Sequence, residues 1–238
     1  MILSLNLWGM LWLRFSLAHF KDIKGIFFDL DGTLFETAPQ LALAVNRMLV
    51  DLKMNTLPEE KISNFIGKGA DNLIRKSIKL SSGKDANEFF VDAIDFFHNH
   101  YEQIAHNSLP YDGVMETISF LKTKGLKLAC ITNKPSIFTD KILCESGLNQ
   151  YLDLILSGDS LEKMKPDPLP IIYSCEFFNI KTNESIMVGD SMNDVEAGSS
   201  AGANVVTVPY GYQSGEKIDS SKVDLAINNF IDIQSIVI

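Results

Sequence analysis

Two acidic residues directly follow an apolar run near the start of the chain. The stretch IFFDLDGTLF, residues 26–35, places Asp29 and Asp31 one residue apart, and Gly32 and Thr33 follow at once. Burying an unpaired carboxylate is costly, and two carboxylates at the end of a buried strand raise each other's pKa unless a cation lies between them. The sequence therefore predicts that a cation, such as a hard divalent metal ion, lies among these carboxylates.

Other polar groups follow later apolar runs in the same way. Thr132 and Asn133 end one run, Lys165 lies in KPDP beyond the next, and Asp190 and Asp194 lie in GDSMND after a third. In an open α/β sheet the functional crevice lies outside the carboxyl ends of the strands. We therefore expect these residues to meet Asp29 and Asp31 at one edge of a sheet.

Such a set of residues suits a phosphoryl group and a magnesium ion. Mg²⁺ prefers one or two carboxylates together with a substrate phosphate, and Asp190 is a candidate ligand. A lysine such as Lys165 suits a phosphate or holds a nucleophilic carboxylate ionised. Asp29 is the candidate nucleophile, because carboxylates form aspartyl-phosphate intermediates. Asp31 is the candidate acid for the leaving alkoxide and base for the attacking water.

The remaining polar groups have supporting roles in this hypothesis. The hydroxyl of Thr132 and the amide of Asn133 can donate hydrogen bonds to phosphoryl oxygens. Asp194 is expected to orient the lysine or a metal-bound water.

Five apolar runs are predicted to be the strands that position these groups. They alternate with helical patterns, which is typical of a doubly wound parallel sheet covered by helices. Most are apolar throughout, as strands buried on both faces should be; the run around Asp153 is weaker and is expected to be shorter. The predicted strands are Gly25–Asp29, Leu126–Thr132, Leu152–Ser157, Ile186–Asp190 and Asn204–Val208.

A helical insertion separates the first two of these strands. Apolar residues at helical spacing around Leu41–Leu52 and Phe89–Tyr101 predict two helices, with two shorter ones on either side of Gly67-Lys68-Gly69. We interpret the aromatic residues between Phe89 and Tyr101 as the core of this insertion. The predicted organisation is a catalytic core at 21–36 and 108–238, a helical cap domain at 37–107, and an N-terminal extension at 1–20.

Composition limits the classes of partner. The 238 residues carry a formal net charge of −9, which argues against a nucleic-acid partner because phosphate backbones are bound by clustered Lys and Arg. Three separated cysteines suggest reduced thiols in a cytoplasmic protein. Residues 1–20 are apolar but lack a positive n-region, and Arg14 would be costly in a bilayer. We interpret them as an accessory helix or the product of an upstream start codon, with a membrane-surface helix as the alternative.

Together, FDLDGTL, ITN, KPDP and GDSMND resemble the haloacid dehalogenase-like superfamily of phosphohydrolases, in this order and at these separations. The resemblance implies a Rossmann-like core with a small helical cap and a Mg²⁺-dependent phosphatase that uses an aspartyl-phosphate intermediate. It implies that Asp29 is nucleophile and metal ligand, that Asp31 is the acid/base whose carbonyl also ligates metal, and that Asp190 is the remaining ligand. Thr132, Asn133 and Lys165 would bind phosphate.

Within this superfamily the cap and C-terminal stretches look most like the phosphoglycolate phosphatase branch, which implies that the substrate 2-phosphoglycolate is hydrolysed to glycolate and phosphate. Lys68, between two glycines where an uncharged residue is usual, and Arg75 on the next helix are the candidate binders of the substrate carboxylate. Both could equally be solvated surface residues. The oligomeric state, monomer or homodimer, is left open.

Two alternatives remain. A β-phosphoglucomutase-like or broad sugar-phosphate phosphatase would share the chemistry of the core and differ in the cap. A phosphoaspartate signalling module would also combine an aspartate, a hydroxyl and a lysine, but it would need neither the acid/base Asp31 nor a closing cap.

Overall fold

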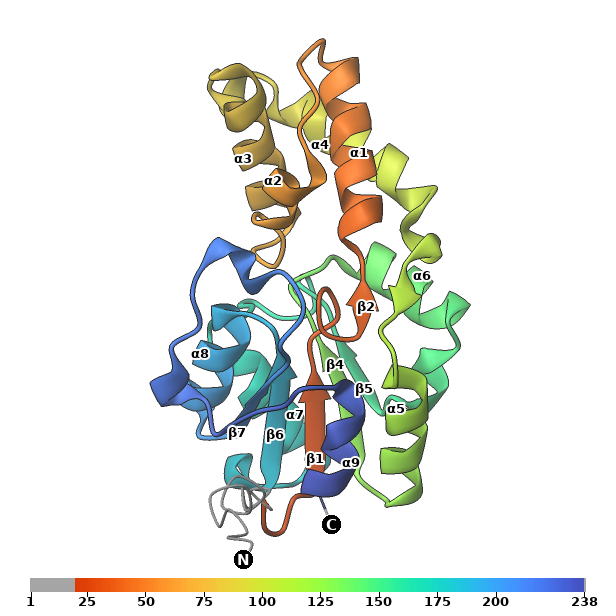
Figure 1. Ribbon diagram of the computed structural model, residues 1–238, viewed down its shortest axis with the longest axis vertical. Helices are drawn as coiled ribbons and strands as arrows, with labels where there is room; N and C mark the ends of the chain where they lie inside the picture. The colour runs from red at the N-terminus through yellow and green to blue at the C-terminus, as the bar shows by residue number, and fades with distance from the viewer. Residues whose placement is uncertain (1–19, 238) are drawn as a thin grey trace, which may run out of the picture.

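A six-stranded parallel sheet forms the centre of the molecule (Figure 1), in a computed structural model that describes residues 20–237. The predicted α/β fold with a parallel sheet is thereby confirmed. Residues 1–19, nearly all of the N-terminal extension expected at 1–20, lie outside the described residues. In spatial order the strands are β5 (Leu154–Leu156), β4 (Lys127–Ile131), β1 (Gly25–Phe28), β6 (Ser185–Gly189), β7 (Asn204–Thr207) and β8 (Leu225–Ala226).

The sheet contains one strand more than the sequence analysis expects. β8 pairs with β7 through two residues only, and a strand this short has no recognisable period in the sequence. β5 is three residues long, in agreement with its weak pattern. β1 lies between β4 and β6, so the acidic stretch that follows it lies at the middle of the sheet.

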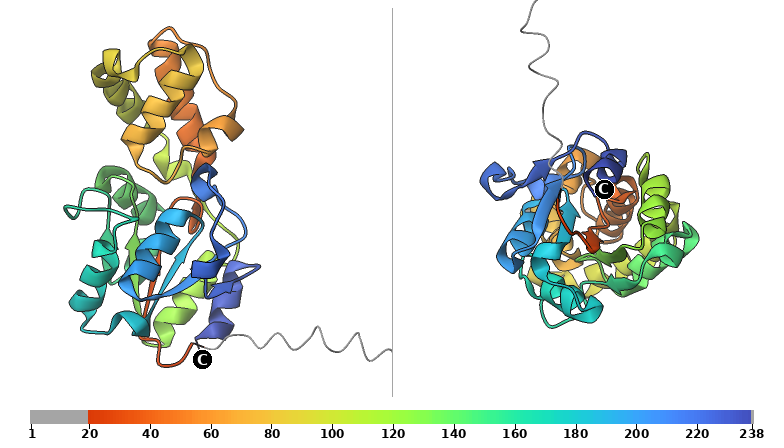
Figure 2. Two further views of the ribbon diagram at one scale, coloured as in Figure 1. Left: turned by 90° about the vertical axis from the view of Figure 1, so that its left-hand side faces the viewer. Right: turned by 90° about the horizontal axis from the view of Figure 1, so that it is seen from below.

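Helices cover both faces of the sheet, as the view from below shows (Figure 2). Ile26 and Phe28 of β1 face one apolar cluster and Phe27 faces the other, because successive side chains of a strand point to opposite faces. The first cluster includes residues of α5 (Val114–Thr123), α6 (Ser136–Glu145) and α9 (Ile233–Ile236). The second includes residues of α7 (Leu169–Phe178) and α8 (Met192–Ala201).

A second group of helices lies beyond one end of the sheet (Figure 1). We call residues 38–107 the cap; they form α1 (Ala38–Asp51), α2 (Glu59–Ser63), α3 (Ala70–Ser82) and α4 (Phe90–Glu102). Two short antiparallel strands, β2 (Phe35–Glu36) and β3 (Leu109–Pro110), form the two connections to the core. None of the helices within residues 20–237 combines the length and apolar character needed to cross a bilayer.

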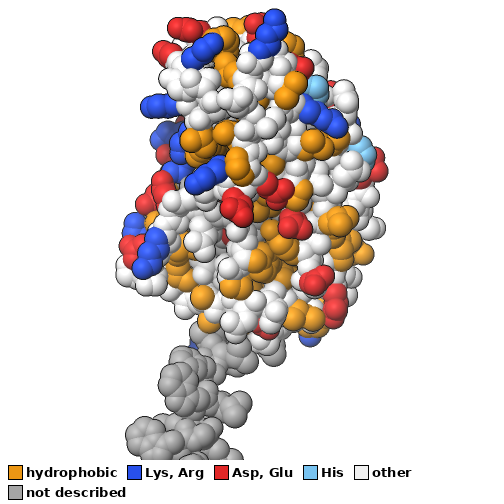
Figure 3. Space-filling view, turned by 45° about the horizontal axis from the view of Figure 1, so that its top comes forward, with side chains coloured by type: hydrophobic (Ala, Val, Ile, Leu, Met, Phe, Trp, Pro, Cys, Tyr) orange, Lys and Arg blue, Asp and Glu red, His pale blue; other side chains and the backbone are white. Residues whose placement is uncertain are grey.

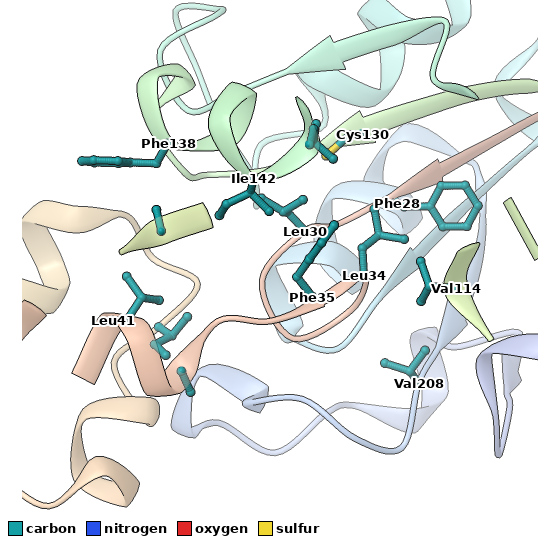
Figure 4. Close-up of a cluster of buried hydrophobic side chains, with 14 of the residues drawn as sticks. Phe28, Leu30, Leu34, Phe35, Leu41, Val114, Cys130, Phe138, Ile142 and Val208 are labelled. Atoms are coloured by element: carbon teal, nitrogen blue, oxygen red, sulfur yellow. The ribbon is translucent and has the colours of Figure 1, made fainter. Parts of the chain in front are cut away.

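The cap and the core share one continuous apolar cluster. It runs from Phe28 through Leu30, Leu34 and Phe35 to Leu41 in the first turns of α1 (Figure 4). Within the cap, α1 packs mainly against α4, through the apolar faces that their 3.6-residue period predicts. The cap is therefore seated on the core by packed side chains as well as by its two connections.

Candidate active site

The carboxyl ends of the central strands place the predicted residues at one edge of the sheet. Asp29 directly follows β1, Thr132 follows β4 and Asp190 follows β6. Lys165 comes from the loop after β5. All four side chains are buried, with between 2% and 6% of their surface exposed. The strand ends and this loop thus form a buried group of charged and polar side chains, which the sequence pattern anticipates.

Lys165 connects two of the carboxylates. Its Nζ lies 2.8 Å from Asp29 Oδ1 and donates a hydrogen bond of 2.6 Å to Asp194 Oδ1. Burial works to lower the pKa of Lys165, but Asp194 and Asp29 outweigh it and raise that pKa above its ordinary value. The ammonium therefore stays charged and holds its charge next to the carboxylate that the sequence analysis identifies as nucleophile.

Asp194 is fixed by the start of α8. Its Oδ2 accepts hydrogen bonds from the backbone N–H of Ser191 at 3.1 Å and from the Ser191 hydroxyl at 2.7 Å. This is a capping box, in which a residue in the first helical turn returns to the residue before the helix. One carboxylate oxygen therefore caps the helix, and the other contacts Lys165.

The carboxylate of Asp190 is in close contact with the main chain of two loops. Its Oδ2 accepts hydrogen bonds from the backbone N–H groups of Tyr212 at 2.6 Å and Gln213 at 3.3 Å, and its Oδ1 accepts one from Thr33. A Cβ atom on Gly32, whose φ is +85°, would lie 2.6 Å from Asp190 Oδ2. Glycine is therefore required both for the turn and for the approach.

Three of these carboxylates could hold a metal ion. Oxygen atoms of Asp29, Asp190 and Asp194 all lie within 4.8 Å of one another. Burial raises the pKa of Asp29 to about 7, against the opposing effect of Lys165. Burial also raises the pKa of Asp190 well above its usual value, and the neighbouring carboxylates Asp194 and Asp29 add to this. Oxygen donors and crowded negative charge fit a hard divalent cation.

Thr132 and Asn133 lie beside this group but differ in what they can offer. The Thr132 side chain is buried and its Oγ1 accepts a hydrogen bond from the Lys134 backbone N–H. Both N–H groups of the Asn133 amide are already donated, to the carbonyl oxygens of Gly67 and Lys165 at 3.0 and 2.7 Å. In this conformation Asn133 therefore joins the core to the cap loop.

Asp31 has a partner that the sequence analysis did not identify. Lys134 Nζ donates hydrogen bonds to Asp31 Oδ1 at 2.9 Å and to Oδ2 at 3.0 Å, and both residues are at least nine-tenths buried. The only local signal is the position of Lys134, directly after Thr132-Asn133 at the carboxyl end of β4. The four carboxylates at this edge thus face only two ammonium groups, those of Lys134 and Lys165. When all are ionised, the group carries two excess negative charges, which a divalent cation would balance.

Lys68 and Arg75, the two expected carboxylate binders, lie elsewhere. Lys68 forms an ion pair with Glu216 of the core. The guanidinium group of Arg75 donates a hydrogen bond to Asn87 Oδ1 and lies 3.7 Å from the centroid of the Phe90 ring. The structure does not bring Arg75 to the strand-end group. On the face seen in Figure 3 both Lys and Arg side chains and Asp and Glu side chains are exposed.

Comparison with known proteins agrees with this geometry. Residues 26–208 match the model of a family described as haloacid dehalogenase-like hydrolase. The chain is 38% identical over 222 residues to a phosphoglycolate phosphatase of Nitrosospira multiformis, covering 92% of this chain and 98% of that protein. It is 42% identical over 209 residues to one of Thiobacillus denitrificans, covering 86% and 91%.

A solved structure shows the same similarity in three dimensions. The crystal structure of a predicted phosphoglycolate phosphatase from Haemophilus somnus has a TM-score of 0.83 with this chain and is 35% identical to it. The match covers 90% of this chain and 98% of that one.

Proposed function

We propose, because the chain belongs to the haloacid dehalogenase-like hydrolase family, that it hydrolyses 2-phosphoglycolate to glycolate and phosphate. The observation that carries this proposal is the buried contact of Asp29 with Lys165, beside Asp190, at the carboxyl ends of β1 and β6. The names of relatives that cover nearly the whole chain support the choice of substrate. A cavity between cap and core, lined by residues of both, lies directly over Asp29 and Asp31.

In this proposal Asp29 attacks the phosphorus atom and the bond to the ester oxygen breaks. Asp31 gives its proton to the leaving oxygen, so that glycolate departs and an aspartyl-phosphate remains. Asp31 then takes a proton from a water molecule, whose oxygen attacks the phosphorus and releases phosphate. Lys165 and the Thr132 hydroxyl stabilise the negative charge on the phosphoryl oxygens.

Mg²⁺ is the metal that we propose for this site. Asp29 and Asp190 would hold it, together with the backbone carbonyl of Asp31, as the family resemblance implies. When bound, it would neutralise negative charge on the phosphoryl group. Asp194 would stay with Lys165, since one of its oxygens caps α8 and the other contacts the ammonium group.

The β2–β3 pair is our proposed hinge between the core and the cap, with the domain boundaries near residues 37 and 107. Cap closure would then exclude water from the aspartyl-phosphate until the leaving group has departed. Contacts of the cap loop with the core support such closure. The carbonyl oxygen of Gly67 accepts hydrogen bonds from the side-chain amides of Asn133 and Asn193 of the core.

The test is phosphate release from a panel of small phosphate esters in the presence of Mg²⁺. The panel contains 2-phosphoglycolate, several sugar phosphates and nucleotides, with EDTA as the blank. We expect a clear preference for 2-phosphoglycolate that EDTA abolishes. Equal, weak activity on every ester would overturn the proposed substrate, and release that is insensitive to EDTA would overturn the proposed metal.

A further inference from the structure

The cavity between cap and core has a charged floor and mostly apolar walls. Among its described lining residues Lys134 is the only cation, and it lies beside Asp31. The cap contributes mainly apolar side chains. The residues that line the cavity are Asp29, Asp31, Thr132, Asn133, Lys134, Pro135 and Phe138 of the core, and Leu41, Ile66, Gly67, Gly69, Ala70, Leu73, Phe97 and Tyr101 of the cap.

Lys134 has a hydrogen-bond donor to spare. An ammonium group carries three N–H donors, and within residues 20–237 the two hydrogen bonds from its Nζ both go to the carboxylate of Asp31. The same Nζ lies 4.8 Å from the centroid of the Tyr101 ring, so it faces the cavity wall. Its contact with both oxygen atoms of Asp31 pairs this ammonium group with an opposite charge.

Tyr101 has an unused hydroxyl in the same place. The residue lines the cavity, its side chain is fully buried, and its hydroxyl, which neighbours the Lys134 ammonium group, has no hydrogen-bond acceptor among the described residues. Burial raises the pKa of this phenol to about 12, although Lys134 opposes it. The group therefore keeps its proton and can donate. Buried polar groups are normally paired, so an unpaired donor here points to a ligand that accepts.

Lys134 and Tyr101 lie beside the place that a carboxylate on the leaving group would occupy. In 2-phosphoglycolate one carbon separates the ester oxygen from the carboxylate. The group that protonates the ester oxygen and the group that binds the carboxylate must therefore be neighbours. Asp31 and Lys134 are in direct contact, whereas Lys68 is paired with Glu216 and Arg75 with Asn87.

We propose that Lys134 Nζ and Tyr101 Oη bind the carboxylate of the leaving group, which makes the enzyme selective for phosphate esters of short hydroxy acids. This inference rests on the proposed function and adds the residues that determine its specificity. Lys134 also positions Asp31. Its loss should therefore lower turnover of every ester, and should lower turnover of carboxylate-bearing esters further.

The test measures kcat/KM for 2-phosphoglycolate and for ethyl phosphate, in which a methyl group replaces the carboxylate. Effects that act through Asp31 are common to both substrates and cancel in the ratio of the two constants. We expect the wild-type ratio to be roughly 10²-fold or more. Lys134→Met should lower this ratio by about 30-fold or more, mainly by raising KM for the carboxylate-bearing ester, and Tyr101→Phe should lower it by about 5-fold.

Two further variants complete the experiment. Lys122→Met removes a partly exposed Lys–Asp pair, between α5 and Asp153, and should leave the ratio unchanged. Lys68→Met tests the rival carboxylate binder, and a fall of the ratio in this variant alone would overturn the assignment to Lys134.

The experiment distinguishes a failure of the proposed substrate from a failure of the proposed carboxylate binders. A wild-type ratio near one would overturn the proposed substrate and the inference with it. A large wild-type ratio that survives in both Lys134→Met and Tyr101→Phe would overturn the inference and leave the proposed substrate standing. If Lys134→Met does not fold, Tyr101→Phe decides, because it removes one oxygen and preserves the packing volume.

Discussion

The two walls of the cavity are built on different principles. On the core wall, Asp29, Asp190 and Asp194 are buried charges with short contacts to lysines and backbone N–H groups. On the cap wall, Leu41, Leu73 and other apolar side chains pack against one another. Buried charges tolerate little displacement because their pairing depends on geometry, whereas apolar packing accepts substitutions of similar volume.

This contrast indicates where chemistry and selectivity reside. The groups that we propose for the chemistry directly follow the strand ends or contact the residues that do. Selectivity can vary through residues that face the leaving group, from the cap or from the loop after β4. Mutations on the two walls should therefore change different kinetic constants, and the following variants separate them.

The largest effect is expected for Asp29→Asn on the core wall. An amide cannot form the aspartyl-phosphate, so turnover should fall by more than about 10⁴-fold. The fold should persist, since the change removes one of several crowded carboxylates. Phosphate release and circular dichroism of the same sample would check both expectations. Substantial activity with an unchanged spectrum would show that Asp29 is not the nucleophile.

Asp31→Asn should have a smaller effect and a distinct signature. Without an acid and base at this position, turnover should fall by roughly 10² to 10⁴-fold, and hydrolysis of the aspartyl-phosphate should slow. Acid quenching with ³²P-labelled substrate would measure the fraction of enzyme that carries the phosphoryl group. Faster turnover without a change in that fraction would contradict the role of Asp31.

The smallest effect is expected where the two walls meet. The Asn193 amide donates a hydrogen bond of 3.1 Å to the Gly67 carbonyl of the cap loop. Asn193→Ala should loosen the closed cap and raise KM by about 5-fold, the equivalent of one hydrogen bond, with little change in the chemical step. Steady-state kinetics on 2-phosphoglycolate would measure this.

Asn204→Ala is the matched control for Asn193→Ala. The Asn204 amide also donates to backbone carbonyls, those of Asn183 and Ser185, but far from the cap within the core. It should lower the melting temperature and leave KM unchanged. An equal rise of KM in both variants would mean that general destabilisation, and not cap closure, controls substrate binding.

Much of the core could be predicted from the sequence, because its strands are short apolar runs that end in polar residues. The run before Asp29 and the run before Asp190 each predict a buried strand, and β1 and β6 are indeed neighbours in the sheet. β8 could not be predicted, since two residues carry no period. The cap helices are predicted by their apolar spacing, which α1 and α4 show clearly.

The aromatic residues of α4 show the limit of such patterns. The sequence analysis interprets them as core of the cap, and Phe97 and Tyr101 are indeed buried. The same two residues also line the cavity, because the face of α4 that packs against its neighbours continues to the interface with the core. Helical periodicity indicates which face is buried but not what it is buried against.

That Asp29, Thr132 and Asp190 meet follows from the order of residues along the chain. The carboxyl ends of parallel strands share one edge, so any residue directly after such a strand is carried to that edge whatever the loops do.

The partners of the other long side chains depend instead on how segments that are separate in the sequence pack together. Lys134 contacts Asp31, while Lys68 and Arg75 bond Glu216 and Asn87. Of these three pairings, only that of Lys68 with Glu216 joins the cap to the core. A long, flexible side chain can reach many groups, so its partner is decided by the tertiary packing around it, which the local sequence does not specify.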